Sequence, residues 1–526
     1  MRDPASTAGK TLAVDEQTEL LVVGGGPAGL AAASEAARLG IKTVLVDENP
    51  VPAEVMGEDI PLLFGGRASG AARNRSAMTD AFVASDPAIE EAFELGVDLR
   101  LGTICWGVYA NGPAVSWLPG PVAGLADADG SRMLGAAHVI VCAGRRDMGL
   151  AFPGWELPGV MGMTAAEQLA TRYGALETRR AVVLGSTTEA VLGAQQLREA
   201  GIEIAAMIEL APAPLDPAAA DCGIELITGH AVRRAEGREG VETIVIAPRD
   251  NPGAERAIAC DTVITAIGAV PVVELLDAAG CRLAFLPERG GHVPVVDADQ
   301  RSTLPHLLAA GDCAGIWPAK SRDPAVASEE GRRAARAVAV ALGRTAPDVL
   351  AASAPPEGPD LAAYRLDWVR ATVVEAAGEP HVCRCEEVTA REILEVRPPR
   401  YLNWQTERRN RRDLASLLGD GAPNPDLVKR LTRAGMGVCQ GRRCREQVAA
   451  LLALGAGAAL AEVPLATHRA PVRPLPLEVA ARPESPEMAA HWDTWFGMAA
   501  QYVPFWDAPR RYRAATRPTR GKAPSE

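Results

Sequence analysis

The amino-acid sequence predicts an α/β protein with two βαβ units of the kind that bind nucleotides, followed by a small α-rich domain. Residues 19–49 and 179–210 each show a buried-strand pattern, a tight turn, a helical stretch and a second strand. Helical segments flanked by paired cysteines follow in residues 380–455. Because a chain of 526 residues is too long for one hydrophobic core, about three domains are expected.

The composition is ordinary for a globular protein. The apolar fraction is 48%, and the net charge of −12 argues against general nucleic-acid binding. The N-terminus lacks a signal-peptide pattern and no apolar run reaches the ~18 residues of a membrane span, so we expect a cytoplasmic protein. Cysteines are mostly reduced there, and six are expected to be small apolar core residues: Cys105, Cys142, Cys222, Cys260, Cys281 and Cys313.

The first βαβ unit carries a dinucleotide-binding motif. Gly24, Gly26 and Gly29 form G-x-G-x-x-G at the turn between strand and helix. In such a motif the first glycine allows the tight turn, the second leaves room for a pyrophosphate, and the third lets helix and strand pack closely. Asp47 ends the next strand, 18 residues after Gly29, where an acid would bond ribose hydroxyls. This context favours a nucleotide site over a Gly-rich turn without a ligand.

The second βαβ unit has lost most of the same motif. Gly185 keeps the first glycine, but Thr187 and Ala190 stand where the second and third would be. A Cβ atom at Thr187 would crowd an approaching pyrophosphate. We therefore expect the fold to persist as a structural domain with weak or lost nicotinamide-nucleotide binding, although Glu209 at the end of its second strand could still meet a ribose.

Three further segments resemble the two-dinucleotide-domain flavoproteins of the glutathione-reductase-like superfamily. These are 138–155 and 260–276, which resemble that family's two crossings between domains, and 306–315, which resembles its late G-D motif. The resemblance implies two Rossmann-like domains and implies that Asp312 holds a flavin ribityl or ribose hydroxyl. Pro27, after "GGG", favours FAD over NAD by the same resemblance. No C-x-x-C or C-x-x-x-x-C pair precedes residue 380, which argues against disulfide-reductase chemistry.

Cys383, Cys385, Cys439 and Cys444 form a C-x-C pair and a C-x-x-x-x-C pair, separated by 53 residues. Paired thiolates suit an iron–sulfur cluster or a structural zinc ion. Zinc sites usually use C-x₂₋₄-C spacing, so the tighter C-x-C favours a cluster, while a vestigial site without metal is a further alternative. The order pair–helix–helix–pair resembles bacterioferritin-associated-ferredoxin-like [2Fe–2S] domains, which have a shorter gap.

Arginines crowd these cysteines in the sequence: Arg384, Arg442, Arg443 and Arg445. They either balance the negative charge of a cluster and raise its potential or form a solvated basic surface.

The segments "FPGWELPGVM", "GDCAG" and "GMGVCQGRRC" extend the resemblance, over roughly residues 18–450, to the A (α) subunits of heteromeric FAD-dependent amine and imino-acid dehydrogenases. This family includes opine oxidases, hydroxyproline and proline dehydrogenases, hydrogen cyanide synthase and heterotetrameric sarcosine oxidase. The resemblance implies a partner β subunit with a D-amino-acid-oxidase-like fold and its own FAD, an FMN at the subunit interface, a [2Fe–2S] cluster on this chain and, in some complexes, a small third subunit.

The resemblance also implies a set of cofactor contacts on this chain. FAD or another adenine dinucleotide would occupy the first site, and Lys320 and Arg322 are either phosphate or flavin contacts or solvated surface residues. The cofactor-binding residues expected are Gly24, Gly26, Pro27, Ala28, Gly29, Asp47, Glu48, Gly66, Arg67, Ala143, Gly144, Gly311, Asp312 and Lys320, and the cluster ligands are Cys383, Cys385, Cys439 and Cys444.

Two functions follow from the sequence, and both are oxidoreductases. The first is an electron-transfer subunit of a multi-subunit amine or imino-acid dehydrogenase, acting on CH–NH or CH–NH₂ donors. It is favoured because His292, His306 and His381 are isolated and no residue stands out as a substrate acid or base. The second is a self-contained NAD(P)H-dependent flavoprotein reductase with an iron–sulfur centre. A non-catalytic scaffold would require loss of both flavin and iron.

The patterns together divide the chain into segments. They are a flexible N-terminus (1–17), the first part of the nucleotide-binding domain (18–155), a second, partly degraded nucleotide-binding domain (156–270), a return to the first domain (271–345), a linker (346–379), the cysteine domain (380–455) and a Pro-rich linker with an aromatic arm (456–526). The aromatic residues at 491–506 are expected to pack on the flavoprotein domains or on a partner subunit.

Overall fold

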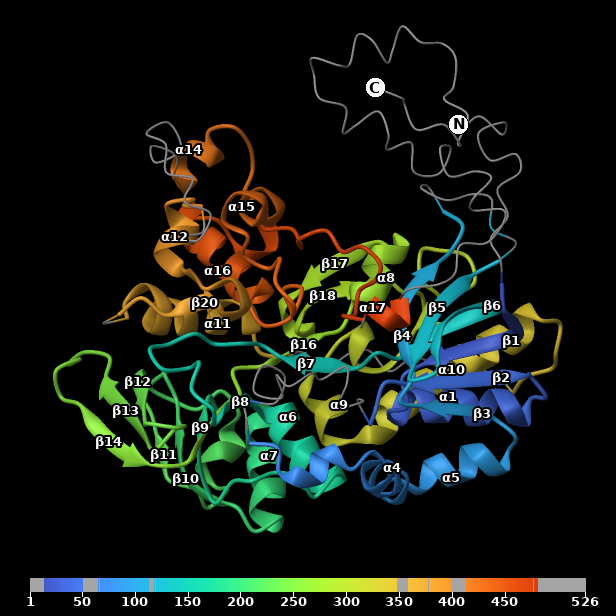
Figure 1. Cartoon of the computed structure of the whole chain (residues 1–526), viewed down its shortest axis with the longest axis horizontal. Helices are drawn as coiled ribbons and strands as arrows, with labels where there is room; N and C mark the ends of the chain where they lie inside the picture. Colours follow the sequence, from blue (N-terminus) through green and yellow to red (C-terminus); the bar gives the residue numbers. More distant parts are fainter. Residues whose placement is uncertain are drawn as a thin grey trace, which may run out of the picture.

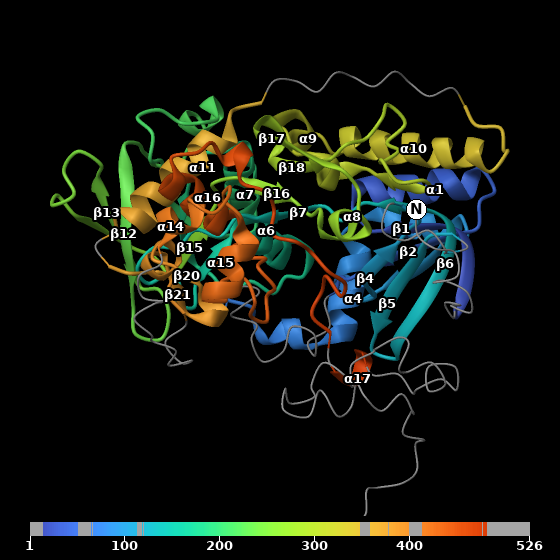
Figure 2. The same ribbon diagram turned by 90° about the horizontal axis from the view of Figure 1, so that it is seen from above.

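The computed structural model describes residues 14–50, 65, 67–112, 118, 120–347, 358–376, 378–398, 413–475 and 477–480. Two α/β units lie side by side, and a small helical module packs against both of them (Figure 1 and Figure 2). The predicted α/β fold with Rossmann-like sheets is confirmed.

The first unit is built on a mixed sheet that is mostly buried. Its strands follow the order β3-β2-β1-β6-β5-β4, and β19 pairs with the C-terminal end of β6, beyond the part of β6 that pairs with β5. The strands β1, β2, β3, β6 and β19 are parallel neighbours, whereas β4, β5 and β6 form an antiparallel meander. Their bounds are β1 Glu16–Val23, β2 Thr43–Asp47, β3 Asp98–Leu101, β4 Ile104–Tyr109, β5 Val122–Asp127, β6 Gly130–Val141 and β19 Leu307–Ala309.

Helices cover the first sheet because β1 and β2 present apolar side chains on both faces. Helices α1 and α10 pack against each other, at a contact where Gly331 meets the backbone of Ala28 so closely that a Cβ atom would lie 2.0 Å from the Ala28 oxygen. The helices of this unit are α1 Pro27–Arg38, α4 Arg75–Ala84, α5 Pro87–Glu94, α8 Glu274–Ala279, α9 Pro318–Arg322 and α10 Pro324–Ala341.

The second unit contains a parallel sheet of order β11-β10-β9-β15-β8 and an antiparallel sheet of order β12-β13-β14. The chain passes between the units twice, and the crossing strands β7 and β16 pair with each other. The bounds of the crossing strands and of this unit are β7 Arg145–Asp147, β8 Val160–Gly162, α6 Met163–Glu167, β9 Arg180–Leu184, α7 Thr188–Glu199, β10 Glu203–Ile208, β11 Leu226–Ile227, β12 His230–Glu236, β13 Thr243–Pro248, β14 Arg256–Ala259, β15 Thr262–Thr265 and β16 Ala269–Pro271. A separate hairpin of β17 Leu283–Leu286 and β18 Gly291–Pro294 follows the second crossing and contacts β16.

The helical module, drawn in orange in Figure 1, holds all four C-terminal cysteines. Its helix α16 packs against α11, α12, α14 and α15, and the module shares one hydrophobic core with the second unit. The elements are α11 Leu361–Val369, β20 His381–Cys383, β21 Val388–Thr389, α12 Ala390–Leu394, α14 Leu414–Leu418, α15 Pro425–Thr432 and α16 Arg445–Ala456, and α17 Leu477–Ala480 follows beside β5 and β6.

Helix α11 lies in the segment that the sequence predicts as a linker. Trp368 is fully buried and Arg365 is 4% exposed, so the helix is part of the core rather than a connection. The aromatic segment 491–506 lies outside the described residues. Among the helices that the structure describes, none combines the length and the apolar character needed to cross a membrane.

Candidate functional site

The glycine loop of the first unit has the shape that a pyrophosphate requires. Gly24 has φ +110°, and a Cβ atom there would lie 2.1 Å from the Cys142 carbonyl oxygen. A Cβ atom at Gly29 would lie 1.8 Å from the Gly24 oxygen, whereas Gly26 has no atom within 4 Å of that position. Helix α1 begins at Pro27, so its unpaired N–H groups and the positive end of its dipole face the open space beside Gly26.

Asp47 supports the glycine loop, and its contact with a ribose stays a prediction. Its Oδ2 accepts from the Gly25 N–H at 2.5 Å, and its Oδ1 accepts from the backbone N–H of Asn49 at 2.7 Å. The side chain is 8% exposed, and burial raises the pKa of its carboxyl group. Asp47 therefore stabilises the loop, and the side chain of the next residue, Glu48, pairs with Arg473 at 2.6 Å.

Asp312 lies where the two units meet. Its Oδ2 accepts from Arg145 Nε at 2.7 Å, and Arg145 also bonds Ser321 Oγ at 3.0 Å and Glu189 at 3.3 Å. Arg145 directly follows Ala143 and Gly144 at the first crossing between the units. Its bonds to Asp312 and to Glu189 of α7 therefore connect the two segments predicted to contact a flavin, at 143–144 and 311–312, with the second unit.

Lys320 is not available for the phosphate or flavin contact that the sequence predicts. The side chain is completely buried, and its Nζ donates to the Gly311 carbonyl at 3.0 Å, the Gly315 carbonyl at 2.8 Å and Glu330 Oε2 at 2.8 Å. Burial lowers its pKa, and its Nζ also lies 3.8 Å from the centre of the Trp317 ring. All three ammonium protons are used within the protein, so none remains for a phosphate.

Two other residues predicted as possible cofactor contacts, Arg67 and Arg322, bond to the second unit instead. Arg67 donates to the carbonyls of Asp261 and Val241 in the second unit rather than toward the glycine loop. Arg322 pairs with Asp216 at 2.5 Å. Gly66 lies outside the described residues.

The second nucleotide site is filled by the protein itself. The Tyr364 hydroxyl from α11 donates to Glu209 Oε2 at 2.8 Å and accepts from the Ser186 N–H at 3.3 Å. Glu209 is fully buried and also accepts from Ser186 Oγ, so it does not meet a ribose as predicted. Thr187 Oγ1 caps helix α7 and donates to Ala266. Tyr364 thus occupies the place where a nucleotide would approach Gly185.

The four C-terminal cysteines converge, as their spacing predicts. Sγ–Sγ distances are 3.9 Å between Cys383 and Cys385 and 3.6 Å between Cys385 and Cys439, and the Cys444 thiol interacts with that of Cys383. The Gly435 N–H donates to Cys383 Sγ at 3.4 Å. Within the described part of the chain, no group of three or more ligand side chains surrounds a single point as one metal ion would require. The thiols contact one another in the order Cys444, Cys383, Cys385, Cys439, and we call this series of contacts the thiol row.

Three arginines beside this row have no carboxylate partner among the described residues. Arg384 donates to the Glu156 carbonyl at 2.8 Å, and Arg442 donates to the carbonyls of Cys439, at 3.2 Å, and Val472. Burial, and then repulsion from Arg473, lower the pKa of Arg442 to about 9, and burial with repulsion from Arg384 lowers that of Arg443 to about 10. An anionic group at the thiols would relieve this positive charge.

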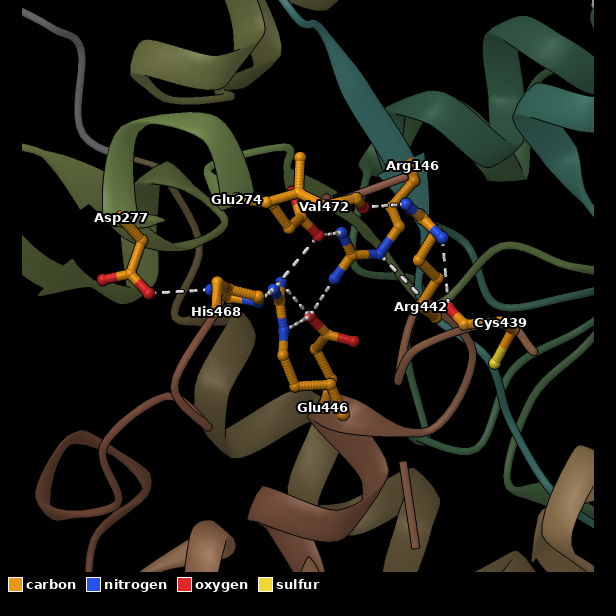
Figure 3. Close-up of polar contacts among 9 residues, drawn as sticks. Arg146, Glu274, Asp277, Cys439, Arg442, Glu446, His468 and Val472 are labelled. Atoms are coloured by element: carbon orange, nitrogen blue, oxygen red, sulfur yellow. Dashed lines mark hydrogen bonds and ion pairs between the residues drawn. The ribbon is translucent and has the colours of Figure 1, made fainter. Parts of the chain in front are cut away.

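Sequence reasoning missed a buried ionic network that joins the module to the crossing strands (Figure 3). Arg146 pairs with Glu274 and, at 2.6 Å, with Glu446, while Arg445 pairs with Glu274 at 3.1 Å and with Glu446 at 2.6 Å. Charges on separate elements carry no sequence periodicity, so no sequence signal could have identified them.

Comparison with known proteins places the fold in a family. The family model described as pyridine nucleotide-disulphide oxidoreductase matches residues 18–351, and a model described as sarcosine oxidase A3 domain matches residues 406–482. The chain belongs to the pyridine nucleotide-disulphide oxidoreductase family, and it is a flavin-dependent oxidoreductase of that fold.

Individual relatives cover almost the whole chain. It is 28% identical to the A-subunit of opine oxidase from Agrobacterium tumefaciens (strain Ach5), over 87% of this chain and 90% of that protein. It is 27% identical to hydrogen cyanide synthase subunit HcnB of Pseudomonas aeruginosa, over 81% and 90%. The crystal structure of L-proline dehydrogenase from P. horikoshii superposes with a TM-score of 0.59 at 20% identity, covering 90% of this chain and 81% of that one, which shows a shared fold.

Proposed function

We propose that this chain is the electron-transfer subunit of a multi-subunit, flavin-dependent amine or imino-acid dehydrogenase or oxidase of the opine type. Electrons would arrive from an FAD on a partner subunit with a D-amino-acid-oxidase-like fold, pass an FMN at the interface and reach a [2Fe–2S] cluster on this chain. The observation that carries the proposal is the row of four thiols flanked by arginines without carboxylate partners among the described residues.

The relatives support the multi-subunit part of this proposal. The opine oxidase and hydrogen cyanide synthase relatives are both named as subunits, and the match to this chain extends over nearly their full lengths. In this proposal the substrate pocket belongs to the partner, which agrees with the absence of an evident acid–base residue in the sequence.

The chemistry of the donors fits a [2Fe–2S] cluster, which takes four thiolates, two for each iron. A bound cluster supplies one-electron transfer. The protein around it would do two things: the Gly435 N–H would donate to the Cys383 sulfur, and Arg442 and Arg443 would offset negative charge. Both effects favour a reduced cluster and raise its potential. Four thiolates also suit zinc, so the metal must be measured.

The first unit would hold FAD or another adenine dinucleotide. The open space at Gly26, the N-terminus of α1 and the acid at the end of β2 are the elements that a pyrophosphate and a ribose need. The alternative, a self-contained NAD(P)H-dependent reductase, requires a second nucleotide site. Tyr364 and Glu209 fill that site, so we do not expect NADH to bleach a bound flavin rapidly.

Metal and sulfide analysis of the anaerobically purified chain tests the proposal. We expect two irons and two sulfides per chain together with flavin absorbance. The C385S variant should lose iron and sulfide and keep its flavin, because Cys385 lies outside the glycine loop of the first unit. The C222S variant is the matched control, since Cys222 is a partly buried thiol whose one hydrogen bond within the described part of the chain is to the Ala219 carbonyl. Zinc without sulfide in the unmodified protein contradicts the proposal.

A further inference from the structure

A cavity lies where the helical module meets the second crossing between the α/β units. Its walls come from β16, the hairpin of β17 and β18, α11, α16 and residues 463–466, and the empty space amounts to about 590 Å³, part of which is open to solvent. Both views of the fold place the hairpin beside α16 (Figure 1 and Figure 2). A cavity of this size at a junction between domains is typical of a small-molecule site.

Most of the cavity wall is apolar, with side chains from each of the surrounding elements: Val270, Phe285, Ala449, Ala450, Leu460 and Leu465. His292 also lines the cavity and lies edge-on to Phe285, with 5.0 Å between the ring centres. Burial, and then repulsion from Arg445, lower the pKa of His292 to about 4, so its imidazole is neutral near pH 7. The wall therefore suits the apolar body of a ligand.

Arg365 of α11 brings one positive charge to this wall. The side chain is 4% exposed, its Nη1 donates to the Gly290 carbonyl at 2.9 Å, and its Nη2 donates to the Ala269 carbonyl at 2.6 Å. Its buried Nε has no partner among the described residues, and no carboxylate there forms an ion pair with it. The two carbonyls orient the guanidinium group without neutralising it, and a buried cation without a counter-ion is costly.

The other charges at the cavity already balance one another. Arg445 and Glu446 line it as well. They belong to the buried network of two arginines and two carboxylates drawn in Figure 3, whose net charge is zero. Arg365 is therefore the charge that a ligand in this cavity would balance.

We propose that the cavity binds a small monocarboxylate with an apolar body. The carboxylate pairs with Arg365, and the body lies against Phe285 and the alanine side chains of α16. Such a ligand contacts the module, the hairpin and the crossing strands at once, so its binding stabilises their association. This inference goes beyond the proposed electron transfer and depends on neither the flavin nor the cluster.

The test uses the purified full-length chain and two probes of nearly the same shape, cyclohexanecarboxylate and the uncharged cyclohexanecarboxamide. Isothermal titration calorimetry should show saturable binding of the carboxylate, about tenfold tighter than that of the amide, because the carboxylate makes a charged hydrogen bond. The carboxylate should also raise the midpoint of thermal unfolding. In R365Q the preference should fall to about threefold or less, and R365K should keep part of it, since lysine retains the charge but not the planar fork.

Two matched controls accompany these variants. R370Q should keep the full preference, because Arg370 directly follows α11 and pairs with Asp367 at the surface. A449F fills the cavity, leaves Arg365 in place and should abolish the binding of both probes, which decides the question if R365Q fails to fold. A456F, a change at the end of the same helix and outside the cavity wall, should bind both probes as the unmodified chain does.

Equal affinity for the two probes, or no saturable binding of the carboxylate, overturns the inference when it is found in the unmodified chain. A preference that survives in folded R365Q, or binding that survives in folded A449F, overturns it as well. Absence of iron or flavin from the same preparation would contradict the proposed function and would leave the binding of these probes unchanged.

Discussion

Polar side chains beside both nucleotide loops are bonded mainly to the protein itself. Lys320 is surrounded by two carbonyls and Glu330, and Tyr364 bonds Glu209. Burying an ammonium or a carboxylate without partners costs several kcal/mol, so each of these groups collects donors or acceptors from nearby backbone and side chains. A residue type that suits cofactor binding is therefore not sufficient to predict a contact.

Replacing Tyr364 by phenylalanine tests whether its hydroxyl is needed as a hydrogen-bond donor to the buried Glu209 carboxylate. The change leaves buried Glu209 with one donor fewer, and we expect the free energy of unfolding to fall by about 1–3 kcal/mol. Urea denaturation followed by circular dichroism measures the effect. Y109F is the control, because Tyr109 has no hydroxyl hydrogen bond among the described residues and should change stability little. Equal stability of the Tyr364 variant and the unmodified protein would contradict the bond.

At the scale of elements, β7, α8 and α16 meet through buried charges of alternating sign. Arg146 and Arg445 each contact both Glu274 and Glu446. Although burial acts to raise the pKa of Glu446, attraction to the two arginines outweighs it and lowers the pKa to about 2. The same balance lowers the pKa of Glu274 below its ordinary range. The network therefore fixes the module onto the crossing strands only while both carboxylates are ionised.

The pH dependence of stability follows from these pKa values. A carboxylate whose pKa is lowered on folding stabilises the protein above its ordinary pKa, near 4.5, and this stabilisation is lost as the pH falls toward 2. For Glu446 the shift corresponds to a contribution on the order of 3 kcal/mol at pH 7.

The E446Q variant removes that contribution. We expect it to be less stable than the unmodified protein at pH 7, with the difference shrinking between pH 4.5 and pH 2, as measured by urea denaturation across this range. E239Q, a change at an exposed carboxylate of the second unit, is the control and should follow the unmodified protein. A difference that does not depend on pH would contradict the ionic role of Glu446.

At the scale of the whole molecule, the helical module contacts both α/β units, and residues 463–475 return from the module to the first one. Through Arg442, Val472 and Arg473 these residues connect the cysteine loop to Glu48, which directly follows β2. It is suited to holding two redox groups at a fixed separation, as the proposed relay requires.

The proposed relay predicts that amine turnover requires a second polypeptide. The purified chain should oxidise opines or imino acids with an artificial electron acceptor at a negligible rate, and co-expression with its partner should restore the activity. Iron and flavin contents of this chain in both preparations serve as the control, since they should be equal. Full activity of the chain alone would show that the substrate site lies in this polypeptide.

The sequence by itself determined the features that depend on neighbouring residues. The glycine spacing specifies the turn from β1 into α1 because only residues without a Cβ fit beside the Cys142 and Gly24 carbonyls. The spacing within each of the pairs Cys383–Cys385 and Cys439–Cys444 likewise depends only on a short stretch of chain, whereas the contact of Cys385 with Cys439 spans 54 residues and needed the tertiary fold.

Only the tertiary structure decided which groups face these sites. Tyr364 meets Glu209 across 155 residues and Arg146 meets Glu446 across 300. Such contacts arise because distant segments bury polar groups against one another, and no periodicity in the sequence records which partner each group finds.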